Sequence, residues 1–181
     1  MRLLIARHCE TDWNARHKVQ GSADIPLNDN GRRQAAALAG KLAAENVSRI
    51  VCSDLSRAVE TARIIGARLG VAVETDARLR ECSFGLVEGM SFRWFKMLFG
   101  GMRGRPYRKR LSYDFRLFGG ESGQRVALRH MQAILALVRA GPHDATVLVI
   151  GHGRGLRTFF TAMGLEHYDD PPQGDYLVLP P

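Results

Sequence analysis

One stretch of the chain decides its fold: Leu3-Leu4-Ile5-Ala6-Arg7-His8-Cys9-Glu10-Thr11-Asp12-Trp13-Asn14. The first four residues form a short apolar run, which is typical of a strand buried in a parallel sheet. Open α/β sheets bind their ligands beyond the carboxyl ends of such strands, and Arg7 and His8 stand at that end. Arginine offers a planar fork of donors suited to phosphate, and neutral histidine offers a nucleophilic nitrogen.

A second apolar run has the same ending. Thr146-Val147-Leu148-Val149-Ile150 leads into Gly151-His152-Gly153. Two histidines thus follow two strand ends, and each precedes small residues and a new helix. We therefore expect His8 and His152 to belong to one site.

Strands alternate with helices along the rest of the chain, which predicts an α/β fold. The expected architecture is a three-layer α/β/α sandwich with a mainly parallel sheet. Asn28 and Ser122 are the expected helix N-caps, and Gly70 is the expected end of a helix that follows Ser53. Predicted strands cover residues 2–6, 49–52, 71–73, 146–150 and, at the sheet edge, 176–179. The other predicted helices cover 29–45, 122–140 and 154–163. The inner side of the helix over 122–140 is expected to carry Val126, Ile134, Leu137 and Val138.

The composition suits a single soluble domain spanning residues 1–181, with 45% apolar residues and no run near the roughly 20 that a membrane helix needs. The three cysteines have no metal-type spacing, and their odd number argues against a disulfide framework. We expect a cytoplasmic protein without a membrane association.

Residues 90–118 lack a regular period, and their glycines and prolines interrupt any long helix. We interpret them as a lid-like insertion. Much of the net charge of +8 falls within 93–116, which suits a solvated face or a lid over an anionic metabolite. Nucleic-acid binding through 103–116 is a further hypothesis that we do not favour. A homodimer stays open, because Trp94, Phe95 and Phe99, expected to be exposed, suit either a dimer contact or packing under the lid.

The motif Arg-His-x-Glu-Thr-x-Trp-Asn, together with Gly-His-Gly, resembles the histidine phosphatase superfamily, in the branch that holds phosphoglycerate mutases and small broad-specificity phosphatases. Within that branch, the size of the chain and the order of its motifs resemble the broad-specificity phosphatases and the α-ribazole phosphatases alike. The resemblance covers residues 1 to about 163 and implies a phosphoglycerate mutase-like fold. Further motifs match in order: Gln20-Gly21, residues 24–27, residues 53–62, Leu79-Arg80-Glu81, Phe84-Gly85, Glu88-Gly89 and Gly119-Gly120-Glu121-Ser122.

The resemblance implies a metal-independent phosphatase without a cofactor that acts on a small phosphorylated metabolite. His8 would carry a covalent phosphoryl group, and Glu81 would be the general acid and base. Arg7, Arg57 and His152 would stabilise the transferring group, while Glu88 and Glu121 would be supporting residues. The implied set of substrate and phosphate-binding residues is Arg7, Asn14, Gln20, Gly21, Arg57, His152 and Gly153.

Two alternatives remain. A phosphoglycerate mutase would use the same core, but such mutases are typically longer and carry an Arg and a Tyr where Cys82-Ser83-Phe84-Gly85 stands here. A noncatalytic phosphate-binding protein is suggested only by Cys9, which replaces the usual glycine after the nucleophile and could crowd the site. His17, His130, His143 and His167 lie outside the motifs, and we expect ordinary surface or core roles for them.

Overall fold

The structure is a computed structural model that describes residues 1–99, 111 and 113–179. Most of the segment 100–112 in the predicted lid, most of the basic cluster and Tyr107 lie outside the described residues. The side chain of Phe99 does so too, so the dimer and nucleic-acid hypotheses that involve these residues stay predictions.

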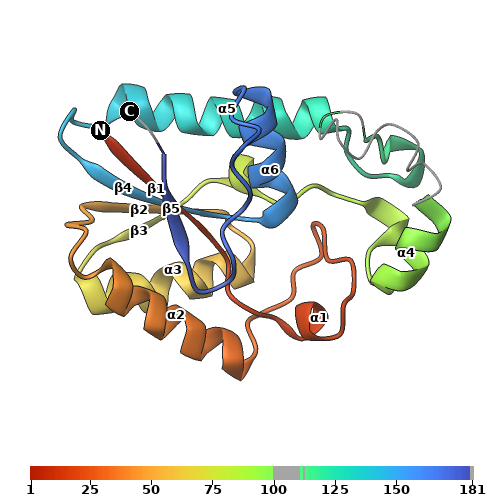
Figure 1. The fold of residues 1–181 in the computed structure, drawn as a ribbon, viewed down its shortest axis with the longest axis horizontal. Helices are drawn as coiled ribbons and strands as arrows, with labels where there is room; N and C mark the ends of the chain where they lie inside the picture. Colours follow the sequence, from red (N-terminus) through yellow and green to blue (C-terminus); the bar gives the residue numbers. More distant parts are fainter. Residues whose placement is uncertain (100–110, 112, 180–181) are drawn as a thin grey trace.

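The sheet has five strands in the order β3-β2-β4-β1-β5 (Figure 1). The first four are parallel, and β5 pairs with β1 in the antiparallel direction at the sheet edge. The mainly parallel sheet predicted from the sequence is confirmed. The strands are β1 Arg2–Arg7, β2 Arg49–Cys52, β3 Val73–Thr75, β4 Thr146–Gly151 and β5 Tyr176–Val178; the helices are α1 Asp12–Ala15, α2 Asp29–Leu42, α3 Ser56–Leu69, α4 Phe92–Phe99, α5 Gly123–Ala140 and α6 Gly153–Ala162.

Two helices cover each face of the sheet, which confirms the three-layer sandwich (Figure 1). Side chains alternate along β1, so Leu4 packs towards α2 and α3, whereas Ile5 packs towards α5 and α6. Leu148 and Val149 of β4 divide in the same way. Apolar runs without polar interruption are therefore the expected sequence of these central strands, because both of their faces are buried.

The described part of the predicted lid-like insertion packs with neighbouring segments in an apolar cluster of its own. Phe95 of α4 is only 6% exposed and contacts Phe84 and Phe115 through aromatic rings. The expectation that Phe95 is exposed was wrong, since the irregular pattern of 90–118 conceals a short helix with a buried face. Trp94, on the same helix, is 56% exposed as expected.

Other differences are local. Val138 was placed on the inner side of α5 but is 46% exposed, because it lies outside the buried stripe formed by Val126, Ile134 and Leu137. The third strand begins at Val73 rather than residue 71, since the N–H of Val71 donates to Gly66 in the turn that ends α3. Helix α2 ends at Leu42, three residues early.

Helix α2 fixes the loop that follows β1. Asn28 caps the helix by accepting from the Gly31 N–H at 2.8 Å, as predicted. Its own N–H donates to the carbonyl of Glu10, and its side chain donates to the Glu10 carboxylate. Gly31 lies so close that a Cβ placed on it would stand 2.1 Å from the Glu10 carbonyl oxygen. The helix and the Glu10 loop therefore meet backbone to backbone.

We predict opposite effects for two Gly→Ala changes in α2. Gly31→Ala should lower the free energy of unfolding by at least about 1 kcal/mol, because a backbone carbonyl blocks the new methyl group. Gly40→Ala should instead raise it by about 0.5–1 kcal/mol, because the nearest atom lies 4.0 Å away and alanine favours the helix. Urea unfolding measures both. Equal effects would contradict the contact.

Candidate active site

The two strand-end histidines lie side by side. Strands β1 and β4 are neighbours with Arg7 opposite Gly151, and the N–H of His8 donates to the Gly151 carbonyl at 3.0 Å. The imidazole rings of His8 and His152 are 5.1 Å apart between centroids. The structure thus brings together the residues that the two apolar runs predicted.

His8 is held in one tautomer. Its Nδ1 lies 2.7 Å from the carbonyl oxygen of Cys9, so Nδ1 carries the proton and donates it to that oxygen. Burial, and then the positive charges of Arg57 and Arg7, hold the pKa of His8 well below its usual range. The ring is therefore neutral at pH 7, and its Nε2 lone pair is available to attack an electrophile.

His152 presents the opposite atom. The Nε–H of Arg57 donates to His152 Nδ1 at 3.3 Å, so the imidazole proton is on Nε2. Among the described residues this buried Nε2 has no hydrogen-bond partner. Burial lowers the pKa of His152 as well, and Arg57 lowers it further. His152 is a neutral donor beside His8, without a protein acceptor in the described chain.

Arg57 is fully buried. Its terminal nitrogens donate to the carbonyls of Gly21 at 2.7 Å and Ala23 at 2.8 Å. Burial lowers its pKa to about 10, so it stays charged at pH 7. Gly21 has a φ of +59°, and an added Cβ would stand 2.3 Å from the Glu88 carboxylate. Gly21 therefore shapes the site by aiming its carbonyl at Arg57, and Glu88 supports that turn by accepting from Ser22 N–H.

Arg7 pairs with Asp170, a residue that the sequence analysis did not single out, and Arg157 pairs with the same carboxylate. Asp170 is 3.2 Å from Arg7 through Oδ2 and 3.1 Å from Arg157 through Oδ1. The Nε of Arg7 is buried without a partner in the described chain. Gly153 permits this arrangement, because a Cβ there would stand 2.6 Å from Asp170 and 3.3 Å from Arg7. The packing role of Gly153 comes from its lack of a side chain.

Glu81 lies at the start of α6. Its carboxylate accepts from the backbone N–H groups of Gly155 at 2.8 Å and Arg154 at 3.1 Å, and from Cys82 at 2.9 Å. The first two are among the helix N–H groups that lack partners inside the helix. Glu81 is thereby fixed against the helix that begins at His152.

A partly buried arginine of α5 holds the segment that carries Glu81. Arg129 donates to the carbonyls of Arg78, Arg80 and Glu81. It also forms a two-point ion pair with Glu121, at 2.9 and 3.1 Å. Glu121 in turn accepts from the N–H of Ser83. Glu121 therefore contacts the segment that carries Glu81 through Arg129 and through the N–H of Ser83.

Asn14 and Gln20 meet at Thr11. The Thr11 hydroxyl lies 3.0 Å from Gln20 Oε1 and 3.1 Å from Asn14 Oδ1. Asn14 Oδ1 also accepts from Gln173. Since the amide oxygen of Asn14 takes these donors, its Nδ2 is the end able to donate to a ligand.

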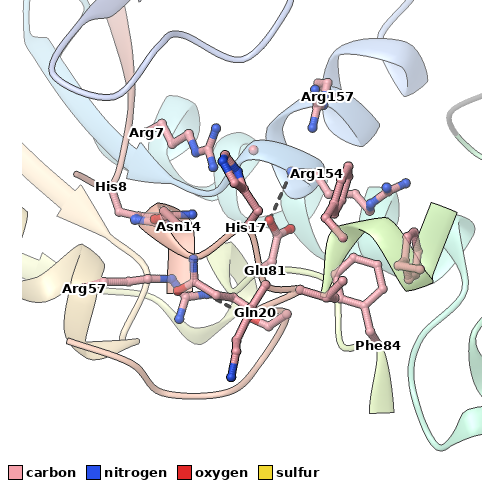
Figure 2. Close-up of a pocket in the computed structure, with 16 residues that line it drawn as sticks. Arg7, His8, Asn14, His17, Gln20, Arg57, Glu81, Phe84, Arg154 and Arg157 are labelled. Atoms are coloured by element: carbon pink, nitrogen blue, oxygen red, sulfur yellow. Dashed lines mark hydrogen bonds between the residues drawn. The ribbon is translucent and has the colours of Figure 1, made fainter. Parts of the chain in front are cut away.

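These groups surround a cavity of about 290 Å³ (Figure 2). Of the nine residues predicted for the site, eight line it, and His152 lies behind, in contact with His8. Sequence reasoning missed several others. Arg154 and Arg157 stand three residues apart, the spacing of one helix face, just after His152, which is a signal it could have used. The additional lining residues are His17, Lys18, Val19, Phe84, Phe92, Phe95, Arg154 and Arg157.

Cys9 does not crowd the cavity. Its side chain is fully buried in a small cluster with Leu27 and Ala35, away from the lining residues. Its φ is not in the positive range that would require glycine. Burial raises the pKa of the thiol to about 11, so Cys9 is a packing residue in its neutral form at pH 7.

A family model described as the histidine phosphatase superfamily (branch 1) matches residues 3–174. The chain belongs to this superfamily. A relative from Yersinia enterocolitica, named "Probable phosphoglycerate mutase GpmB", is 32% identical over 174 residues, which cover 91% of this chain and 76% of the relative.

Solved structures of the superfamily share the fold. A mycobacterial glucosyl-3-phosphoglycerate phosphatase in complex with VO3 matches with a TM-score of 0.88 at 30% identity, over 99% of this chain and 90% of that one. YhfR from Bacillus stearothermophilus matches with a TM-score of 0.81 at 29% identity, over 98% and 89%. The fold is therefore that of phosphoglycerate mutase-like proteins, and the chain is similar to phosphoryl-transfer enzymes.

No group of three or more His, Cys, Asp or Glu side chains is placed to hold a metal ion within the described residues. No helix in the same part of the chain is long and apolar enough to cross a membrane.

We predict that this histidine phosphatase fold loses stability as the pH falls from 6.5 to 5. Burial lowers the pKa values of His8 and His152, and lowers that of His130 to about 4. Below about pH 6.5 these histidines bind protons in the unfolded chain but stay neutral in the native one. The free energy of unfolding therefore rises with pH across this window. The loss should be about 2 kcal/mol for each such histidine at pH 5.

Urea unfolding at pH 7.5 and 5.0 measures this loss. His130→Gln should reduce the difference in the free energy of unfolding between pH 7.5 and 5.0, because it removes one histidine whose pKa is lowered in the native state. His143→Gln, at an exposed position, is the control. An equal pH dependence in the wild type and His130→Gln would contradict the prediction.

Proposed function

We propose that the protein is a phosphatase that hydrolyses small phosphomonoesters through a phosphohistidine on His8 Nε2. One observation carries the proposal: beside the neutral, oriented His8, two buried donors, Arg7 Nε and His152 Nε2, have no partner in the described chain. An unsatisfied buried donor is costly, and the equatorial oxygens of a phosphoryl group are the acceptors that would satisfy both.

The first step follows from this arrangement. His8 Nε2 attacks phosphorus, the P–O ester bond breaks, and the departing oxygen takes a proton from the Glu81 carboxyl group. Arg57, Arg7 and His152 offset the negative charge on the phosphoryl oxygens, and Asn14 Nδ2 is a further donor. Because His8 attacks as a neutral group, the nucleophile brings no further negative charge to the phosphoryl group.

The second step returns the enzyme to its starting state. Water gives a proton to the Glu81 carboxylate and attacks phosphorus, and the N–P bond breaks with its electron pair returning to His8. Inorganic phosphate leaves. Glu81 lines the same cavity as His8, and the helix N–H groups that fix it also fix the direction of both proton transfers.

A mutase is the second candidate, and the relative named as a phosphoglycerate mutase favours it. The residues after Glu81 favour hydrolysis. Cys82 is buried, and neither it nor Ser83 supplies the Arg and Tyr side chains typical of mutases at these positions. Incubation with 3-phosphoglycerate distinguishes the two, since a mutase yields 2-phosphoglycerate and a phosphatase yields free phosphate.

We predict that wild-type protein releases phosphate from 4-nitrophenyl phosphate in the presence of a chelator and that His8→Ala abolishes turnover. Glu81→Gln should still release one burst of nitrophenol, because this leaving group needs little protonation. Its steady-state turnover should fall by at least about 100-fold, because water is no longer deprotonated. Rapid-quench kinetics and an acid-labile phosphoenzyme report the two steps. Undiminished turnover by folded His8→Ala would exclude the mechanism.

We also predict that Arg129 acts as a positioning residue for Glu81. Arg129→Lys retains the charge but loses the fork that holds three carbonyls and Glu121. Turnover of an alkyl phosphate, whose leaving group needs a proton, should fall about tenfold more than the nitrophenol burst rate. Arg125→Met is the matched control, because Arg125 also pairs with Glu121 but its side chain is 76% exposed. Equal losses for both esters would indicate a merely structural role.

A further inference from the structure

Asp170 is a carboxylate that the proposed mechanism does not use. Its side chain is only 6% exposed, and it is not among the described residues that line the cavity. Its two oxygens instead contact two arginines that do line it (Figure 2). Oδ2 lies 3.2 Å from Nη1 of Arg7, and Oδ1 lies 3.1 Å from Nε of Arg157. Asp170 therefore lies directly behind the cavity wall.

The contact leaves one edge of the Arg7 guanidinium for a ligand. Asp170 accepts from Nη1, so the edge formed by Nε and Nη2, whose N–H bonds are parallel, is the one that remains. Nε is the buried atom that has no partner in the described chain. Two parallel N–H bonds of a guanidinium match two oxygens of a phosphoryl group. Asp170 thus determines which edge of Arg7 is presented beside His8.

The position of Asp170 is itself fixed. A Cβ on Gly153 would stand 2.6 Å from Asp170 Oδ2, so the carboxylate packs closely against the start of α6. Gln173, three residues further along the same segment, donates to Asn14 Oδ1 at 2.9 Å. The segment between α6 and β5 therefore holds two of the residues proposed to bind the phosphoryl group, Arg7 and Asn14.

Asp170 also offsets positive charge beside the phosphoryl position. Arg7, Arg57 and Arg157 all line the cavity, and inorganic phosphate has to leave it after each turnover. The acceptors of Arg57 are two carbonyls and an imidazole, which are neutral groups. The carboxylate of Asp170 supplies a negative charge to the other two arginines. A negative charge this near the cavity weakens the attraction for a bound anion.

We infer that Asp170 is a positioning residue that orients Arg7 for phosphoryl transfer and weakens the binding of inorganic phosphate, so that the product leaves. The inference rests on the proposed function. Binding of a free anion depends mainly on charge, whereas the transition state also requires Arg7 in one orientation. Loss of the carboxylate should therefore slow the chemical step while it tightens the binding of phosphate. A residue with only a structural role would not produce this split.

Asp170→Asn tests the split, because asparagine has the same shape but one acceptor oxygen for two arginines. The rate of the nitrophenol burst from 4-nitrophenyl phosphate should fall about tenfold. The inhibition constant of inorganic phosphate should fall about threefold or more, which means tighter binding. Asp175→Asn is the matched control, since Asp175 belongs to the same segment but pairs with Lys41 at the surface. It should keep both wild-type values.

Asp170→Glu separates charge from position. It retains the charge but is one methylene longer in a closely packed place, so the burst should slow while the inhibition constant of phosphate stays near the wild-type value. An unchanged burst rate in folded Asp170→Asn, or a slower burst without tighter phosphate binding, overturns the inference while the phosphatase stands. Absence of turnover that depends on His8 in folded wild type overturns the proposed function itself.

Discussion

The pairing of β1 with β4 is the constraint on which the site depends. Arg7 lies opposite Gly151, so the two chains turn away from the sheet at the same level and place His8 beside His152. A shift of one residue would send Leu4 and Ile5 to the wrong faces. Both side chains are fully buried in different apolar clusters, so the core fixes the register and, through it, the distance between the two imidazoles.

Arg57 adds a second constraint. A fully buried guanidinium is costly to desolvate, and here the carbonyls of Gly21 and Ala23 and the Nδ1 of His152 offset that cost. These acceptors come from the loop after Gln20 and from the start of α6. One cation on α3 therefore ties both segments together. It also sets the tautomer of His152, because a donating Nε–H requires an unprotonated Nδ1 opposite.

The sequence carried the parts of this arrangement that are local. Apolar runs marked β1 and β4, and Asn28 marked the start of α2, because strand burial and helix capping depend on neighbouring residues. The contact of Asp170 with Arg7 joins residues far apart in the chain, and no pattern in the sequence near either residue predicts it. The burial of Phe95 was missed for the same reason: its partners, Phe84 and Phe115, belong to other segments.

At Cys9 the family motif predicts glycine, whereas the packing of the fold accommodates a cysteine side chain. The motif predicts glycine there because the backbone approaches the phosphate pocket, but the side chain of Cys9 leaves on the other side, towards Leu27 and Ala35. The residue therefore changes the wall of a small core and leaves the cavity lining as it is. The noncatalytic alternative loses its only support from the sequence.

Helix α6 gathers several groups of the site. Its N-cap is His152, its first N–H groups hold Glu81, and Arg154 lies in its first turn. One rigid element therefore fixes the positions of these three residues relative to one another, and the hydrogen bond from Arg57 to His152 ties that element to α3.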